Sequence, residues 1–183
     1  MKRTVAPPKT FRILANDPSL TAWGWVVVEN DRIIDCGCIK TEPNTNKTRI
    51  RKGDDRVRRV SEINKALLTV ITKYKVSYMA SELPHGSQSA VSAVMIGITA
   101  GIMQTFSDIL GIGLEWYSEQ DAKKSVVNKK SATKDEIKQA INKLYKVPWT
   151  GIGYRDESIA DALAVYHVMQ GQSATVQFFK SNQ

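Results

Sequence analysis

Short apolar runs dominate the first part of the chain. Residues 11–17, 23–29 and 32–41 are rich in Ile and Val and are separated by turn-forming residues, which predicts three strands. The pair Asn30-Asp31 between the second and third runs is typical of a tight hairpin turn. We therefore expect these three strands to form an antiparallel meander.

The apolar residues change to a helical spacing after this meander. From Val57 to Tyr74 they recur at three- and four-residue steps, which predicts an amphipathic helix that lies on a sheet. Further strands are predicted at residues 76–82 and 113–117, and further helices at residues 88–107, from 118, from 133 and at about 156–169. The pattern as a whole predicts an α/β fold, in which three antiparallel and two parallel strands form a mixed five-stranded sheet flanked by helices.

The length of 183 residues suits one hydrophobic core, so we expect a single domain at residues 11–170. Residues 1–10 are expected to be a short flexible lead, because their basic residues precede no apolar run of the kind found in a signal peptide or membrane anchor. Residues 171–183 are expected to be a C-terminal tail.

One segment raises the question of a membrane. Residues 88–107 contain no charged side chain and place Gly97 and Gly101 at the GxxxG spacing of membrane helices. Their Ser, Thr and Gln content favours a buried helix instead. We therefore expect no membrane partner and a cytoplasmic protein.

The charge balance points to a polyanionic partner. Lys and Arg number 26 against 18 acidic residues, which gives a net charge of +8. Many of the basic residues gather in one stretch, and we expect the following to bind the phosphate backbone of DNA: Lys47, Arg49, Arg51, Lys52 and Arg56. The alternative for this stretch is an ordinary solvated loop.

The cysteines and histidines exclude other kinds of site. Cys36 and Cys38 would lie on one face of a strand rather than in a disulfide, which fits a reducing compartment. With two histidines and no CxxC pair, a structural zinc site is not expected. Any bound metal ion would have carboxylate ligands.

Three carboxylates occupy places where a charge is costly. Asp17 and Glu82 each end an apolar strand, and Asp161 interrupts the apolar segment IADALAVYHVM. Buried carboxylates that gather in one place repel one another unless a cation lies between them. Mg²⁺ or Mn²⁺ would resolve this conflict, and two ions ~4 Å apart would be suited to phosphodiester hydrolysis.

Each carboxylate has a structural explanation when it is considered alone. Asp17 could start the turn before Pro18, Glu82 could be a surface residue, and Asp156 and Glu157 could stabilise the start of the last helix. Asp161 is hardest to explain in this way, because its neighbours are apolar. The three together favour a metal site.

From about residue 12 to 169 the sequence resembles the RuvC family of Holliday junction resolvases, within the ribonuclease H-like superfamily, and its phage-encoded members in particular. The likeness rests on an Asp-Pro turn with a Gly seven residues after the Asp, a strand-end Glu, two lysines eleven residues apart, and a closing ADALA motif. The matching residues are Asp17, Pro18, Gly24, Glu82, Lys123, Val126, Val127, Ser131, Ala132, Lys134 and Asp161.

The resemblance implies a ribonuclease H-like fold and a homodimeric endonuclease that resolves four-way DNA junctions by paired nicks. Other branched DNA is a further candidate substrate. Asp17, Glu82 and Asp161 would hold two Mg²⁺ or Mn²⁺ ions per active site, and Lys123 and Lys134 would contact phosphate, with Lys134 counted among the catalytic residues. The helix at residues 88–107 would form the dimer interface. Whether a helicase partner takes part stays open.

The sequence departs from the family pattern at two places. The family carries an Asp or His three residues before the Asp of ADALA, where this chain has Ser158. Glu157 lies on the same helix face as Asp161, so we predict Glu157 as the fourth catalytic and metal-binding residue, with Asp156 as the reserve. The family also carries an aromatic wedge residue a few positions after the strand-end Glu. This chain lacks that aromatic residue and has His85 near the same position.

Three alternatives remain. The DPSLT segment and the hairpin after it also resemble the phosphate loop of actin-like and sugar-kinase ATPases, although those enzymes need two such domains. Ser158 keeps open a catalytically weak module that only binds branched DNA. A ribonuclease H or a flap-type nuclease would use the same fold.

Overall fold

The structure is a computed structural model that describes residues 10–44, 50–83, 86–87 and 89–181. The predicted lead at residues 1–10 therefore lies almost entirely outside the described residues. Lys47, Arg49 and His85 also lie outside them.

The order of the elements confirms the predicted pattern of strands and helices. In chain order they are β1 (Arg12–Asp17), β2 (Ala22–Glu29), β3 (Arg32–Lys40), α1 (Lys52–Tyr74), β4 (Tyr78–Leu83), α2 (Ala90–Leu110), β5 (Gly113–Ser118), α3 (Glu119–Val127), α4 (Lys134–Leu144), α5 (Gly153–Gln172) and α6 (Ala174–Ser181). The helices α3 and α4 begin where their capping patterns predict, with Ser118 and Thr133 as N-caps, and Thr133 forms a full capping box with Glu136.

The five strands form one mixed sheet in the order β3-β2-β1-β4-β5. β1, β2 and β3 are antiparallel, whereas β4 pairs in parallel with β1 and β5 pairs in parallel with β4. Asn30 and Asp31 join β2 to β3 with φ angles of 50° and 61°, the left-handed geometry of a tight hairpin turn. The predicted fold class is confirmed.

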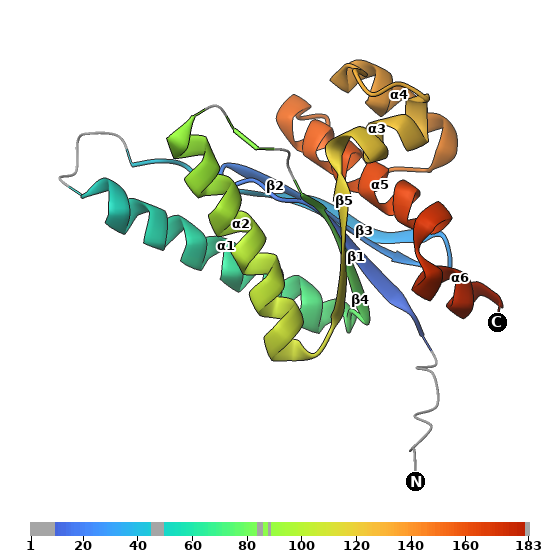
Figure 1. Ribbon diagram of the computed structural model, residues 1–183, viewed down its shortest axis with the longest axis horizontal. Helices are drawn as coiled ribbons and strands as arrows, with labels where there is room; N and C mark the ends of the chain where they lie inside the picture. The colour runs from blue at the N-terminus through green and yellow to red at the C-terminus, as the bar shows by residue number, and fades with distance from the viewer. Residues whose placement is uncertain (1–9, 45–49, 84–85, 88, 182–183) are drawn as a thin grey trace, which may run out of the picture.

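Helices cover both faces of the sheet (Figure 1). On one face, α1 and α2 pack over Leu14, Trp23 and Met79. On the other face, α5 lies across the middle strands with α3 and α4 beside it, over a core that includes Ile13 and Ala15. Alternate residues of β1 thus face opposite layers, and Asp17 faces the layer of α5.

The helix α5 lies unusually close to β2. A Cβ atom added at Gly24 would stand 2.0 Å from the backbone carbonyl oxygen of Ser158. Every residue from Ser158 to Ala160 is buried, as are Ala162 and Leu163. The small residues of this segment and Gly24 therefore allow α5 to press directly on the sheet.

Two expectations from the sequence are wrong or incomplete. The helix α2, whose one charged residue is Asp108, is mostly exposed within this chain, because its buried residues are Thr99, Ile102 and Met103 alone. By length and composition it is the one helix in the described part of the chain that could cross a membrane, with 17% of its apolar window buried. The predicted tail is helical over Ala174–Ser181, and Val176 on it is buried.

Candidate active site

Pairing of β1 with β4 brings Asp17 and Glu82 together. Asn16 pairs with Ser81 in this parallel register, so the next residue on each strand, Asp17 and Glu82, stands at the same end of the sheet. Both side chains face the α5 layer, since side chains alternate along a strand. The parallel register of β1 and β4 thus places these two strand-end carboxylates side by side.

Asp161 reaches the same place from α5. Its neighbours along the helix are buried against the sheet, while Asp161 itself is partly exposed. Together with Glu82 it lines a cavity of about 70 Å³, which has room for several water molecules. The cavity lies where the carboxyl ends of β1, β4 and β5 meet α5.

The electrostatics of these carboxylates show their mutual repulsion. Burial, followed by the charges of Asp161 and Glu82, raises the pKa of Asp17 well above its usual range. Burial and the charge of Asp161 raise the pKa of Glu82 to about 7. Burial raises the pKa of Asp161 to about 6, although Lys134 and Lys123 oppose the rise. A cation in the cavity would relieve this cost.

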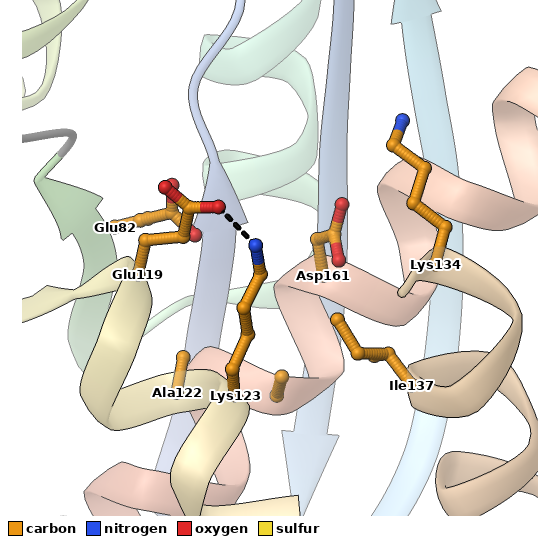
Figure 2. A pocket seen from close by; sticks show the side chains of 8 residues that line it. Glu82, Glu119, Ala122, Lys123, Lys134, Ile137 and Asp161 are labelled. Carbon is orange, nitrogen blue, oxygen red and sulfur yellow. Dashed lines mark hydrogen bonds and ion pairs between the residues drawn. The ribbon is translucent and has the colours of Figure 1, made fainter. Parts of the chain in front are cut away.

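Two lysines stand at the rim, as the sequence predicts. Lys123 on α3 and Lys134 on α4 both line the cavity, on either side of Asp161 (Figure 2). Each is held by a glutamate: Lys123 pairs with Glu119 one helical turn earlier, and Lys134 Nζ lies 2.7 Å from Glu157 Oε2. The pairing with Glu157 raises the pKa of Lys134, so this lysine is charged near neutral pH.

The three residues considered for the fourth acidic position differ in their contacts. Glu157 pairs with Lys134 at the rim and is not itself among the lining residues. Asp156 is buried and accepts hydrogen bonds from Thr150 and Lys138. The Ser158 hydroxyl donates to the carbonyl oxygens of Ala22 and Tyr154. Asp156 and Ser158 therefore hold α5 in place, and Glu157 as the fourth ligand stays a prediction.

Glu119 is a cavity residue that the sequence analysis missed. It is the first residue of α3 and lines the cavity with Glu82 and Asp161. The segment SEQD at residues 118–121 has the pattern of a helix cap, which explains an acid there without a functional site, although Glu119 directly follows β5 just as Asp17 ends β1. The rule that singled out strand-end carboxylates would have found it.

The described part of the basic stretch, which covers Arg51 and the first two turns of α1, divides into two groups. Arg59 is buried and donates hydrogen bonds to Thr41, Leu20 and Thr21, and Arg58 pairs with Asp55 and Glu62, so both serve the fold. Lys52 is exposed, Arg56 is half-buried, and Arg51 pairs with Asp54 while 87% of its side chain is exposed. The last three are the described residues of the stretch that can still face DNA.

The donor set of the cavity fits a hard divalent cation. Glu82 and Asp161 line the cavity, and Asp17 stands beside Glu82 at the end of the neighbouring strand, so all three offer the carboxylate oxygens that Mg²⁺ and Mn²⁺ prefer. Burial raises the pKa of the Cys38 thiol, which disfavours the thiolate that a softer metal ion would bind. Within the described ranges no three Asp, Glu, His or Cys side chains already enclose a single ion position. Water and phosphate oxygens would complete the shell, as is usual for Mg²⁺.

Comparisons with known proteins identify the family of the chain. The family model "Crossover junction endodeoxyribonuclease RuvC" matches residues 13–168. The RuvC protein of Gluconacetobacter diazotrophicus is 27% identical over 168 residues, which cover 89% of this chain and 93% of that protein. The RuvC protein of Methylobacillus flagellatus is 28% identical over 167 residues, or 89% of each chain.

Solved structures show the same fold. Thermus thermophilus RuvC in complex with a Holliday junction substrate has a TM-score of 0.68 and 19% identity, over 91% of this chain and 96% of that one. The yeast mitochondrial Holliday junction resolvase Ydc2 has a TM-score of 0.57 and 14% identity, over 94% and 86% of the two chains. Because the family model spans most of the sequence, this chain belongs to the RuvC family of crossover junction endodeoxyribonucleases.

Proposed function

We propose that this protein is a metal-dependent, structure-selective endonuclease that resolves Holliday junctions by paired phosphodiester nicks. The observation that carries the proposal is the meeting of Asp17, Glu82 and Asp161 at one end of the sheet. Glu82 and Asp161 line a cavity there together with Lys123 and Lys134. Family membership supports the choice of four-way DNA as the substrate. A cytoplasmic location with access to DNA follows from this activity.

The acidic residues and the lysines of the site would have different roles in the reaction. Asp17, Glu82 and Asp161, with Glu157 at the edge, would hold Mg²⁺ or Mn²⁺, two ions per active site. Bound ions supply an activated water and stabilise the leaving oxygen. Lys134 and Lys123 would place their ammonium groups against the scissile phosphate, where negative charge develops in the transition state. The raised pKa values of the acidic residues mean that metal ions compete with protons for the site.

The basic stretch and α2 would adapt the enzyme to a branched substrate. Arg51, Lys52 and Arg56, together with the predicted contacts Lys47 and Arg49, would bind phosphates without reading sequence. The exposed apolar face of α2 would pair two copies of the chain, since Val91, Val94 and Ile109 are 59%, 49% and 76% exposed. A two-fold dimer presents two active sites to a junction with two equivalent strands.

A second candidate function is a module that binds branched DNA with little or no cleavage. Ser158 favours it, because the family pattern has an acidic or histidine residue there and the Ser158 hydroxyl is bound to backbone carbonyls. The same DNA-binding surface would serve both functions, so only a cleavage assay separates them.

The test is nicking of an end-labelled immobile four-way junction with Mg²⁺ or Mn²⁺, beside a linear duplex of matched sequence. Wild-type protein should cut two opposite strands of the junction and leave the duplex intact. Asp17→Asn should bind the junction with similar affinity and cut neither. Tight binding by wild type with no product under either metal would support the binding module instead.

A further inference from the structure

The fold carries Glu119 to the same end of the sheet as the other carboxylates. β5 pairs in parallel with β4, and Ser118 stands opposite Leu83 at the end of that register. Ser118 then caps α3, whose first residue is Glu119. Glu119 thus follows the end of β5 as Asp17 ends β1, one strand beyond Glu82.

The side chain of Glu119 points into the cavity. Glu119 and Glu82 both line it, and the two carboxylates lie on the same side of Lys123 (Figure 2). The next turn of α3 places the buried Ala122 against the core, which fixes the side of the helix that faces the cavity. Glu157 is not among the lining residues, and its carboxylate is paired with Lys134.

The partner of Glu119 is itself a residue of the site. Glu119 forms an ion pair with Lys123, whose side chain is 23% exposed, while that of Glu119 is 44% exposed. An ion pair this open to water contributes little stability and exchanges easily. A divalent cation is a stronger partner for the carboxylate than the ammonium group, and a phosphate is a good partner for the lysine that is released.

We propose that Glu119 is the fourth acidic side chain of this active site, and that binding of a divalent cation exchanges the Glu119–Lys123 ion pair for a carboxylate–cation contact. The exchange leaves Lys123 free for a substrate phosphate. Glu119 thereby takes the place that Ser158 leaves without an acidic group. The inference rests on the proposed function in one respect, that Asp17, Glu82 and Asp161 bind a cation.

Binding of Mn²⁺ to the protein without DNA tests the first half, with the free ion measured by electron paramagnetic resonance. Glu119→Gln should weaken Mn²⁺ binding roughly tenfold or more. Asp121→Asn is the matched control, because Asp121 is an exposed acid in the same helical turn that does not line the cavity. It should bind Mn²⁺ within about twofold of wild type, and circular dichroism should show both variants folded. Wild-type affinity in Glu119→Gln would overturn the proposal.

Binding of an immobile junction in EDTA tests the second half. Glu119→Gln should bind the metal-free junction more tightly than Asp121→Asn does, although both variants lose one negative charge. Adding Lys123→Met to Glu119→Gln should remove that gain. An equal gain in Glu119→Gln and Asp121→Asn would mean that general charge alone acts and that Lys123 is not released.

Asp17→Asn separates the failure of this inference from the failure of the proposed function. If Asp17→Asn loses Mn²⁺ binding while Glu119→Gln keeps it, Glu119 is not a ligand but the metal site stands. If neither variant changes Mn²⁺ binding, the metal site itself is refuted, and the proposal for Glu119 falls with it.

Discussion

The carboxylates of the active site set the chemistry of this protein residue by residue. With a pKa of about 7 for Glu82 and about 6 for Asp161, and a pKa for Asp17 that is raised further by burial, the site retains protons near neutral pH in the absence of a cation. Protons and metal ions therefore compete for the same oxygen atoms. Gathering these carboxylates at one place therefore destabilises the metal-free fold.

Unfolding of the metal-free protein should reveal this cost. Because their pKa values are raised in the folded state, the native protein binds more protons than the unfolded chain, so stability should fall as pH rises from about 4, where the unfolded carboxyls titrate, to about 7. Asp17→Asn should be more stable than wild type at pH 8 by about 1–2 kcal/mol. Urea titrations of the metal-free protein at pH 5 and 8 measure both effects. A less stable Asp17→Asn would contradict the repulsion.

Lys134 should act on the phosphate and not on the metal ion. Lys134→Met should slow single-turnover cleavage of a junction about 10²-fold, since a preorganised charge near the transition state is lost. Its Mn²⁺ affinity should be unchanged or higher. Lys143→Met on the same helix is the control, because Lys143 is exposed near the other end of α4 and lines no part of this cavity. A loss of Mn²⁺ binding in Lys134→Met would point to a structural role.

At the residue scale the sequence reveals which side chains stand in unusual positions, but not which groups they contact in the folded protein. Asp17, Glu82 and Asp161 are recognisable because carboxylates rarely end apolar strands or interrupt an apolar helix. Glu119 is missed because an acid in the first helical turn has an ordinary explanation. The roles of Arg58 and Arg59, at the end of the same basic stretch, are hidden for a similar reason: only the fold shows that their guanidinium groups bind Asp55 and Thr41.

At the scale of elements, α5 is positioned by its contact with β2. The sequence shows a glycine seven residues after Asp17 without showing why, and the fold supplies the reason in the backbone of Ser158. Because that backbone carries Asp161 one turn later, the position of the helix and the position of the carboxylate are linked.

Gly24→Ala should therefore damage both the fold and the site. The new Cβ would lie 2.0 Å from a backbone oxygen that cannot rotate away, so we expect a loss of about 2–4 kcal/mol and a sharp loss of Mn²⁺ binding. Gly53→Ala is the control, since nothing lies within 4 Å of a Cβ placed there. Thermal unfolding measures the difference, and equal melting temperatures for the two variants would contradict the close approach.

The spacing of apolar residues predicts whether a segment is a helix or a strand, but it does not predict what that segment packs against. The three- and four-residue steps of α1 and the capping box of α4 are local signals, and both helices appear where they are predicted. The apolar composition of α2 indicates burial without saying whether a sheet or a second chain provides it. The helix α6 is missed because one buried residue, Val176, is too little pattern to detect.

At the scale of the whole molecule, the exposed apolar face of α2 is the surface that we propose to pair with a second copy of the chain. Val94→Asp should shift a dimer to monomers, since an unpaired carboxylate buried at the interface would weaken association at least ~10²-fold. Leu144→Asp on α4, on the opposite face of the sheet, is 47% exposed and should leave the dimer intact. Sedimentation analysis gives the masses, and a monomeric wild type would refute this interface.

The most direct test of the whole account is cleavage of a supercoiled plasmid that extrudes a cruciform, which is a four-way junction within closed circular DNA. A dimeric resolvase with two active sites cuts both strands within one binding event, so wild type with Mg²⁺ should yield linear plasmid, and Asp17→Asn should yield neither linear nor nicked product. Nicked circles as the sole product, or equal cleavage of a plasmid without the cruciform, would contradict paired resolution of a four-way junction by this protein.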